Sequence, residues 1–265
     1  MRYLLTIGMV WFAALFTLAQ DRSAYTKHIF TSNDKELPYR LLSPLNNTGK
    51  KFPLIIFLHG AFERGNDNES QLNIGGRFFL RDSIRLKYPA YVLFPQCPAD
   101  ITWAYFENQV DYTTGYAKDW NFPFRKEPAA VSALLKKLID QLIASGSIDV
   151  SRIYIAGLSQ GGMGVLDLIA RYPETFAAGI SICGAGEPAT TKLFAGKVAL
   201  WLFHGSKDPV VPKDFSQQFY KRLKREGSVV RYSEYSGVEH NSWVNAFAEP
   251  ELMSWLFMQG KLSRP

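Results

Sequence analysis

The sequence has few cysteines and no internal repeat or low-complexity linker. Its 265 residues include only two Cys, which can form at most one disulfide, so a disulfide-stabilised scaffold is excluded. Apolar residues make up 47% of the chain, which excludes a disordered or collagen-like protein, because such chains lack the apolar surface that offsets the entropy lost on ordering. We therefore expect one globular domain with a sizeable buried core.

A strong excess of charge of one sign is also lacking. Lys and Arg number 30 against 24 Asp and Glu, which gives a net charge of +6. The basic clusters are short, and Lys221-Arg222 with Lys224-Arg225 lie at a spacing typical of a solvated helix face. Nucleic-acid binding would need a basic stripe interleaved with exposed aromatic residues. The sequence has no such stripe, so we expect no nucleic-acid partner.

Motifs for metals and organic cofactors are absent as well. The sequence has no clustered Cys and His ligands, no G-x-G-x-x-G after a strand and no Walker loop. We therefore expect neither a metal nor an organic cofactor.

The first residues differ in composition from the rest of the chain. Arg2 is the only charged residue before Asp21, and residues 3–18 are almost wholly apolar. A membrane anchor is the alternative, but a run of about 16 residues is shorter than the ~20 that span a bilayer. Because the run ends in Thr17-Leu18-Ala19, with small residues where signal peptidase needs them, we predict that residues 1–19 are a signal peptide cleaved after Ala19. The mature protein would then be secreted or periplasmic, with no membrane contact.

The remaining chain, residues 20–265, alternates strand and helix patterns and is predicted to form a single α/β domain. Residues 25–31 and 37–43 flank a turn-rich segment and predict an antiparallel hairpin. Short apolar runs predict further strands at 54–58, 91–94, 153–156, 178–182, 198–203 and 230–235. Helix patterns occupy 129–143, 163–172, 214–225 and 243–258. Because several strands are apolar on successive residues, we expect a mostly parallel central sheet with helices on both faces.

Each cysteine follows one of these strands. Cys97 comes after the strand at 91–94, and Cys183 comes after the strand at 178–182. These strands are not neighbours in the expected sheet, so we expect two unpaired, partly buried thiols.

A candidate nucleophile follows the strand at 153–156. The chain runs from this strand through Gly157-Leu158-Ser159-Gln160-Gly161 into a helix, which is the context of a nucleophile elbow. Such a sharp turn leaves almost no room for a side chain two residues before and two residues after the serine, while the serine itself is strained and projects outward. Ser159 is therefore the predicted nucleophile.

A serine nucleophile needs a base and a carboxylate that orients the base. Asp208 follows the strand at 198–203, and His240 follows the strand at 230–235, so acid and base come after the serine in the expected order. Because the carboxyl ends of parallel strands meet at one edge, we expect the three side chains to lie together. A helix-capping or turn aspartate is the alternative for Asp208.

The tetrahedral intermediate of such a reaction carries an oxyanion, which backbone N–H groups stabilise. One donor comes from the residue after the nucleophile, here Gln160, and the other from the loop after an earlier strand. In that loop, which begins at His59, Ala61 is the predicted donor and Phe62 is the alternative.

These segments resemble a group of secreted bacterial α/β-hydrolases. The motifs are HGAFERGNDN at 59–68, PQCP at 95–98, GLSQGG at 157–162 and GVEHNSW at 237–243. They look like those of the predicted peptidases, or prolyl-oligopeptidase-like esterases, which are similar to feruloyl esterases and polyhydroxybutyrate depolymerases. The likeness covers roughly residues 25–258 and implies the α/β-hydrolase fold, with Ser159, Asp208 and His240 at the family's triad positions.

The sequence departs from this family in the oxyanion loop. Members usually have Gly where this chain has Phe62, and we expect the bulky side chain to narrow the acyl pocket. Glu63 and Arg64 follow, and they either pair to rigidify the loop or form an ordinary surface ion pair.

A long connection, residues 96–127, separates the strand at 91–94 from the next helix. It is rich in aromatic residues: Trp103, Tyr105, Phe106, Tyr112, Tyr116, Trp120, Phe122 and Phe124. A loop of this length near strand ends is usually functional. We expect Phe62, Trp103 and Trp120 to contact an aromatic acyl group or a sugar ring. Packing of the insertion onto the body is the alternative.

The sequence thus predicts a secreted serine carboxylesterase. Its substrates would be small-molecule esters or acyl, feruloyl or acetyl esters on plant polysaccharides. One alternative is a serine peptidase for small peptides, although prolyl oligopeptidases usually carry a propeller domain and we expect none within these residues. The other is a catalytically inactive binding module, against which the complete set of Ser, Asp and His argues.

Overall fold

The computed structural model describes residues 21–46 and 49–261. The predicted signal peptide, residues 1–19, lies outside the described residues. Among the described helices, none is both long and apolar enough to cross a membrane.

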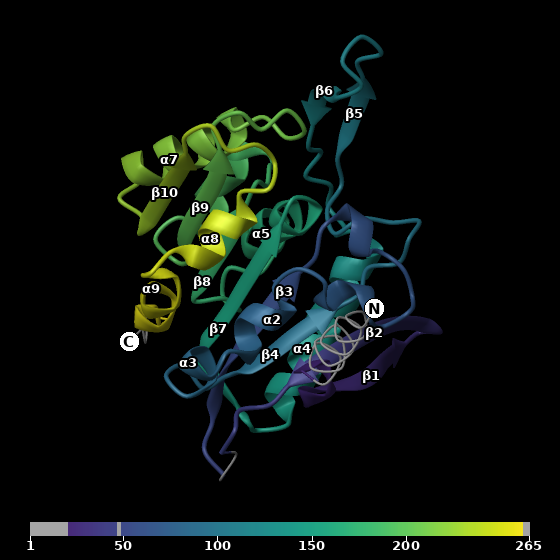
Figure 1. The fold of residues 1–265 in the computed structure, drawn as a ribbon, viewed down its shortest axis with the longest axis vertical. Helices are drawn as coiled ribbons and strands as arrows, with labels where there is room; N and C mark the ends of the chain where they lie inside the picture. The colour runs from purple at the N-terminus through teal and green to yellow at the C-terminus, as the bar shows by residue number, and fades with distance from the viewer. Residues whose placement is uncertain (1–20, 47–48, 262–265) are drawn as a thin grey trace, which may run out of the picture.

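An eight-stranded, mostly parallel sheet forms the centre of the molecule, in the order β1-β2-β4-β3-β7-β8-β9-β10 (Figure 1). The strands are β1 (Tyr25–Ser32), β2 (Lys35–Leu42), β3 (Phe52–Leu58), β4 (Tyr91–Pro95), β7 (Ile148–Leu158), β8 (Ala178–Ile182), β9 (Ala199–Gly205) and β10 (Val230–Tyr235). The hairpin β1–β2 is antiparallel, as is β2 to β4, whereas every other pair is parallel. The predicted sheet and its N-terminal hairpin are therefore confirmed.

Helices cover both faces of this sheet, as predicted. They are α2 (Gly76–Leu80), α3 (Asp82–Arg85), α4 (Ala130–Ala144), α5 (Gln160–Arg171), α6 (Thr191–Phe194), α7 (Asp214–Arg225), α8 (Trp243–Ala248) and α9 (Leu252–Met258), with 3-10 turns η1 (Asp21–Ala24), η2 (Ala61–Glu63), η3 (Ser70–Leu72) and η4 (Pro188–Thr190). Successive residues of β3 point to opposite faces. Ile56 packs in the cluster that holds residues of α4, α5 and α7, and Phe57 packs in the cluster that holds residues of α2, α8 and α9. The core therefore has two layers, one on each face.

The prediction of one helix over residues 243–258 is wrong. The chain forms two helices there, and Glu249 between them has an extended backbone, with φ −63° and ψ 116°. Pro250 follows, and a proline ring disfavours helical backbone in the residue before it.

The two thiols are unpaired, as predicted, but they are fully and not partly buried. Cys97 and Cys183 are free and fully buried, and β4 and β8, which precede them, are separated in the sheet by β3 and β7.

The aromatic-rich insertion contains a separate two-stranded ribbon. It is formed by β5 (Glu107–Val110) and β6 (Ala117–Asn121), which pair antiparallel and project from the body beyond the sheet (Figure 1). All four residues of β5 are exposed, so the ribbon has no apolar face buried on the body along this strand. The sequence patterns did not predict these strands.

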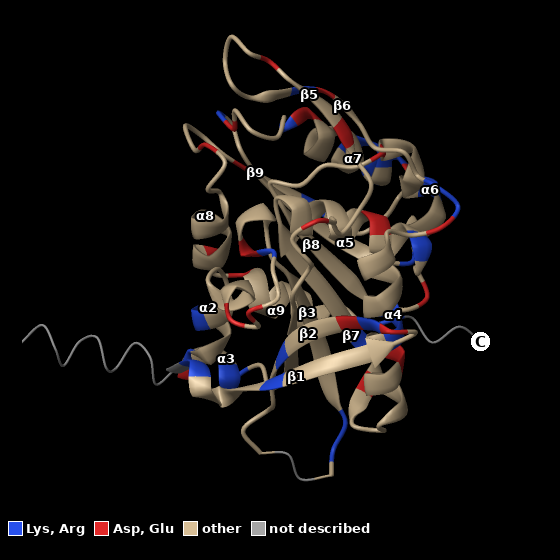
Figure 2. Ribbon diagram, turned by 90° about the vertical axis from the view of Figure 1, so that its right-hand side faces the viewer, with Lys and Arg blue, Asp and Glu red and all other residues tan. Residues whose placement is uncertain are grey.

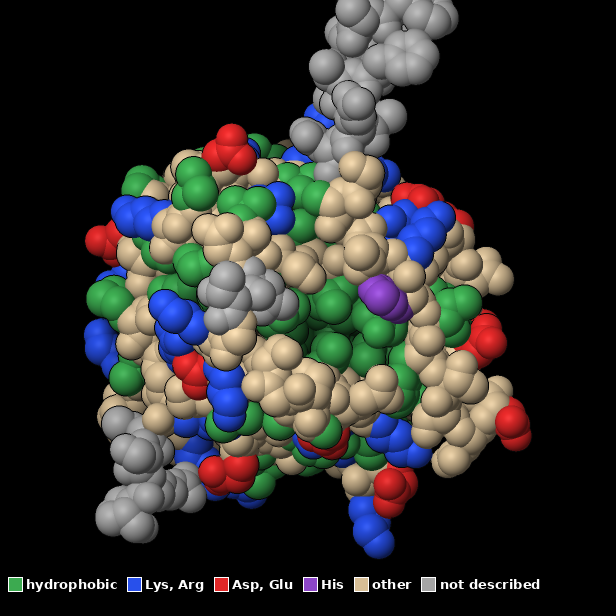
Figure 3. Space-filling view, turned by 90° about the horizontal axis from the view of Figure 1, so that it is seen from below, with side chains coloured by type: hydrophobic (Ala, Val, Ile, Leu, Met, Phe, Trp, Pro, Cys, Tyr) green, Lys and Arg blue, Asp and Glu red, His purple; other side chains and the backbone are tan. Residues whose placement is uncertain are grey.

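Charged side chains lie mainly on peripheral helices and loops, and few lie in the central strands (Figure 2). On α7, Lys221, Lys224 and Arg225 are exposed while Phe219 and Leu223 are fully buried, which is the expected solvated face of an amphipathic helix. At the end of the molecule opposite the ribbon, hydrophobic side chains gather in the middle of one face within a rim of polar and charged groups (Figure 3). No basic stripe is seen in either view.

The backbone of α5 passes very close to the end of β3, and glycine makes this possible. A Cβ added to Gly161 would lie 2.1 Å from the carbonyl oxygen of Leu58, and one added to Gly157 would lie 2.5 Å from the carbonyl oxygen of Gly161. The predicted need for glycine on both sides of the elbow is confirmed. The same approach brings the loop after β3 next to the start of α5.

Gly161→Ala should destabilise the protein by about 1–3 kcal/mol, because the new methyl group collides with backbone that cannot rotate away. The free energy of unfolding, measured by urea denaturation, checks this. Gly260→Ala is the control, because its added Cβ meets only the Ser151 carbonyl oxygen, at 4.0 Å. Equal stability of the two variants would contradict the close approach.

Candidate active site

Ser159 lies at the sharp turn between β7 and α5. Its backbone has φ +53° and ψ −121°, a conformation that non-glycine residues rarely adopt, and its N–H donates to the carbonyl oxygen of Ile182 at 2.9 Å. Strain of this kind persists only where the surrounding structure holds it. Here β8 and the glycine contacts of α5 hold the turn, so the serine hydroxyl stands at the carboxyl end of the sheet.

His240 connects this serine with the predicted acid. Ser159 Oγ donates to His240 Nε2 at 3.0 Å, and His240 Nδ1 donates to Asp208 Oδ2 at 2.8 Å. The loop that carries His240 passes over the end of β9, where a Cβ added to Gly205 would lie 2.2 Å from the carbonyl oxygen of Glu239. The structure thus brings together the three side chains that the sequence placed after three separate strands.

The Asp208 carboxylate is fully buried and is held by four groups. Oδ1 accepts the N–H groups of Val210 at 2.9 Å and Val211 at 3.0 Å, while Oδ2 accepts from His240 and lies 3.3 Å from His204 Nε2. Burial raises the pKa of this carboxyl, but the hydrogen bonds with His204 and His240 outweigh burial and hold the pKa well below its usual range. Asp208 is therefore ionised at neutral pH.

The pKa of His240 is shifted in the opposite direction. Burial alone lowers it, but the hydrogen bonds with Asp208 and Cys183 raise it by more, so that the net shift is upward from the usual 6.5. A positive charge on the ring is therefore stabilised at this position. Such an environment suits a base that must accept a proton from a serine hydroxyl.

Two backbone N–H groups flank the serine, as expected for an oxyanion site. Gln160 is the first residue of α5, where N–H groups have no partner within the helix, and Ala61 is the first residue of η2. A Cβ added to Gly60 would lie 3.8 Å from Ser159 Cβ, so the loop bearing Ala61 lies directly beside the nucleophile. Phe62, the alternative donor, lies one residue further into η2.

The oxyanion loop is braced by residues from the insertion and by Arg64. Trp103 Nε1 donates to the carbonyl oxygen of His59 at 3.1 Å, and His59 Nε2 accepts the N–H of Cys97 at 2.9 Å. Arg64 Nε donates to the carbonyl oxygen of Ala61 at 3.0 Å. These bonds fix the carbonyl groups on either side of Gly60 and so set the direction of the neighbouring N–H groups.

Three expectations for this region are corrected. Trp103 is fully buried and supports the loop, so the prediction that it contacts substrate is wrong. Phe62 is 97% exposed, so it does not narrow a pocket. Glu63 and Arg64 form no ion pair: Arg64 bonds to backbone carbonyls, and the buried Glu63 carboxylate accepts the N–H groups of Glu63 and Gly60.

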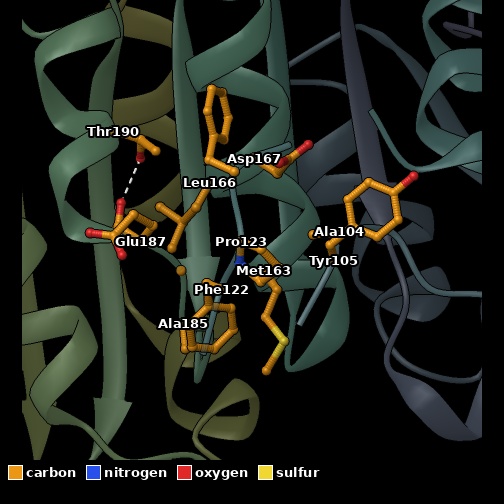
Figure 4. A pocket seen from close by; sticks show the side chains of 12 residues that line it. Ala104, Tyr105, Phe122, Pro123, Met163, Leu166, Asp167, Ala185, Glu187 and Thr190 are labelled. Carbon is orange, nitrogen blue, oxygen red and sulfur yellow. Dashed lines mark hydrogen bonds between the residues drawn. The ribbon is translucent and has the colours of Figure 1, made fainter. Parts of the chain in front are cut away.

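A narrow pocket lies beside the site, beneath the insertion. Its lining comes from Ala104, Tyr105, Phe122, Pro123, Phe124, Met163, Leu166, Asp167, Ala185, Gly186, Glu187 and Thr190. Figure 4 shows Phe122, Met163 and Ala185 close together, with Glu187 and Thr190 to one side. Met163 follows Ser159 by one helical turn, because its N–H donates to the carbonyl oxygen of Ser159 at 3.0 Å, and none of the three proposed triad residues lines the pocket.

Trp120 packs on Phe122, one of the residues that line this pocket. Its ring stacks on Phe122 at 5.7 Å between centroids and packs against Phe106 at 5.5 Å, and Phe122 in turn packs on Phe215 of α7 at 5.1 Å. The Trp120 side chain is half-buried, and its Nε1 has no hydrogen-bond partner among the described residues. Part of the aromatic insertion thus packs on the body, which was the alternative interpretation.

The sequence patterns missed one residue of this site. Cys183, directly after β8, has its Sγ within 4.8 Å of ligand atoms of both His240 and Asp208. The available signal was the strand order, because β8 lies between β7, which leads to Ser159, and β9, which leads to Asp208. A residue directly after β8 must therefore lie between nucleophile and acid.

Comparison with known proteins shows that this chain is similar to esterases and to a depolymerase. A solved thermostable esterase is 35% identical, with a TM-score of 0.80 over 91% of this chain and 64% of its own. Carboxylesterase SOBER1 of Arabidopsis thaliana is 28% identical over 71% of this chain and 82% of its own. Poly(3-hydroxyalkanoate) depolymerase C of Paucimonas lemoignei is 36% identical over 53% of this chain.

The chain spans 30% of that depolymerase and less than two thirds of the thermostable esterase. The model of the phospholipase/carboxylesterase family matches residues 45–250, most of the described structure. The fold is that of the α/β-hydrolases, as the sequence predicted. The chain belongs to the phospholipase/carboxylesterase family.

Proposed function

We propose that this protein is a serine carboxylesterase in which Ser159, His240 and Asp208 act as a catalytic triad. The observation that supports it most is the unbroken hydrogen-bond chain from Asp208 Oδ2 through His240 to Ser159 Oγ, with distances of 2.8 and 3.0 Å, at a strained turn. A serine hydroxyl is a poor nucleophile without a base in contact, and this geometry supplies one.

The reaction proceeds in two halves. Ser159 Oγ attacks the ester carbonyl as His240 Nε2 takes its proton, and the N–H groups of Ala61 and Gln160 stabilise the oxyanion. His240 then returns the proton to the leaving alcohol, which leaves an acyl group on Ser159. Water, deprotonated by His240, attacks this acyl-enzyme and releases the acid. Asp208 remains ionised throughout and stabilises the imidazolium.

The residues around the triad support the proposal that the substrate is an ester with a flat or short acyl group. Phe122, Met163 and Ala185 give the adjacent pocket an apolar end, and Trp120 stacks on Phe122. Phe62 offers a ring that is 97% exposed at the oxyanion loop. Aromatic rings of this kind suit feruloyl groups or sugars. The proposed substrates are therefore feruloyl, acetyl or other acyl esters, including those on plant polysaccharides.

The place of action is proposed to be outside the cytoplasm, in the periplasm or the medium. The support for this is the sequence of residues 1–19, whose apolar run and small residues are typical of a signal peptide.

Ser159→Ala should lower kcat/KM for esters by about 10⁴-fold or more, because the acyl-enzyme cannot form. The measurement is the initial rate on para-nitrophenyl acetate, butyrate and octanoate, methyl ferulate, acetylated xylan and a proline-containing peptide anilide. Ser254→Ala, at a half-buried serine on α9 whose hydroxyl donates to the carbonyl oxygen of Glu251, is the control and should retain the wild-type rate. Cleavage of the anilide alone would assign a peptidase, and cleavage of none would assign a binding module.

The pH dependence should reflect the raised pKa of His240. Only the neutral ring accepts the serine proton, so kcat/KM is lost as pH falls through that pKa, and the half-maximal rate should lie above pH 6.5. Asp208→Asn removes a group that raises this pKa, so its acid limb should move to lower pH while the rate falls by about 10⁴-fold. A wild-type midpoint at or below 6.5 would contradict the electrostatic assignment. His28→Gln, an exposed histidine on β1, is the control.

Phe62→Ala tests the aromatic contact without disturbing the core, because this side chain is 97% exposed. KM for methyl ferulate should rise about tenfold, as expected for loss of an apolar contact, with little change for para-nitrophenyl acetate. Trp120→Ala should act in the same direction. Tyr112→Ala, 96% exposed on the connection between β5 and β6, is the matched control. If Phe62→Ala changed KM equally for both esters, the proposed contact between Phe62 and an aromatic acyl group would be contradicted.

A further inference from the structure

Three side chains of different chemistry meet at the proposed active site. The thiol of Cys183, the carboxylate of Asp208 and the imidazole of His240 each offer one ligand atom, and these atoms lie within 4.8 Å of one another. Among the described residues, no other set of three or more His, Cys, Asp or Glu side chains meets this condition. Cys183 is therefore a neighbour of the proposed triad that takes no part in the bond-making steps of the esterase reaction.

The three groups are held with different rigidity. Cys183 is fixed at the end of β8, where its N–H donates to the carbonyl oxygen of Phe203 at 2.8 Å and its side chain is fully buried. Asp208 is fixed by the backbone N–H groups of the β9 loop. His240 lies on the loop before α8, and its side chain is 18% exposed. The imidazole is therefore the only one of the three side chains that solvent reaches, and it marks the side from which an ion can enter.

The distances are close to those of a tetrahedral site. Zn²⁺ binds sulfur at about 2.3 Å and nitrogen or oxygen at about 2.1 Å, which places ligand atoms roughly 3.3–3.8 Å apart. The Cys183 Sγ would have to approach the other two ligand atoms by at most about 1.5 Å. His240 Nδ1 and Asp208 Oδ2, which are 2.8 Å apart, would have to separate by about 0.5 Å as their hydrogen bond breaks. Thiolate and imidazole ligands favour Zn²⁺ and softer ions, whereas Mg²⁺ and Ca²⁺ favour sets made of oxygen alone.

We propose that Cys183, Asp208 and His240 form an inhibitory binding site for a soft divalent cation of the Zn²⁺ or Cd²⁺ class. Binding forms a metal–sulfur bond, a metal–nitrogen bond to His240 Nδ1 and a metal–oxygen bond, and it breaks the hydrogen bond between His240 Nδ1 and Asp208 Oδ2. The thiol proton goes to solvent, and the Nδ1 proton is replaced by one on Nε2. No electron transfer takes place. With the imidazole and the carboxylate both on the metal, Ser159 has no base, so hydrolysis stops until the ion is removed. The inhibition rests on the proposed esterase function, whereas the binding does not.

The chain offers two matched controls. Cys97 is the other thiol, also fully buried, and its Sγ donates to the carbonyl oxygen of Ile101 at 3.4 Å, away from this set. His28 is an exposed imidazole on the hairpin, where surface binding of metal would occur. Cys97→Ser and His28→Gln therefore separate the proposed site from general thiol or histidine chemistry.

The first test is inhibition of ester hydrolysis by ZnCl₂ and CdCl₂, with MgCl₂ as the comparison. Each variant is normalised to its own metal-free rate. Wild type, Cys97→Ser and His28→Gln should be inhibited at micromolar Zn²⁺, should be insensitive to millimolar Mg²⁺ and should recover with a chelator. Cys183→Ser should need at least tenfold more Zn²⁺. Equal sensitivity of wild type and Cys183→Ser, or no inhibition of wild type, would overturn the proposal.

The second test needs no activity. Titration with CdCl₂ should produce an ultraviolet sulfur-to-cadmium charge-transfer band that saturates at one ion per chain in wild type and Cys97→Ser. The band should be lost in Cys183→Ser and should need at least tenfold more Cd²⁺ in His240→Gln, which keeps the thiol. An unchanged band in both variants would refute the site. A saturable band that depends on Cys183, in a protein without ester hydrolysis, would keep the metal site and reject the esterase function.

Discussion

The arrangement of the site depends on one buried charge. The Asp208 carboxylate has no exposed surface, and a buried carboxylate stays ionised only if hydrogen-bond donors surround it. Two backbone N–H groups of its own loop and the rings of His204 and His240 provide them. One of these donors is the proposed base, so the same hydrogen bond that satisfies the carboxylate also orients His240 towards Ser159. Loss of this charge would remove both functions together.

The main fold and the proposed triad were predictable because local chemistry fixed them. The elbow around Ser159 needs glycine where a Cβ would strike backbone, and the contacts of Gly157 and Gly161 show why no larger residue fits. Asp208 and His240 each follow a strand of a parallel sheet, and the carboxyl ends of such strands meet at one edge. The order of these residues along the chain and the direction of the strands were therefore sufficient to predict that Ser159, Asp208 and His240 lie together.

The features that the sequence could not predict depend on where a side chain points and on which strands lie next to each other in the sheet. The strand β5 is exposed on all four residues, so it has no alternation of apolar and polar residues to reveal it. An aromatic residue in the long connection points inward like Trp103, which is fully buried, or outward like Tyr112, which is 96% exposed, and composition does not distinguish them. Cys183 lies beside His240 only because β8 passes between β7 and β9.

The most direct test of the central claim is to identify the residue that forms the covalent bond with an active-site reagent. The wild-type protein is treated with a fluorophosphonate, and the modified peptide is sequenced by mass spectrometry. We expect one label per chain, on Ser159, that does not form when the protein is first unfolded, because an unfolded serine has no base. A label on another residue, or no label on the folded protein, would contradict the assignment of Ser159 as the activated nucleophile.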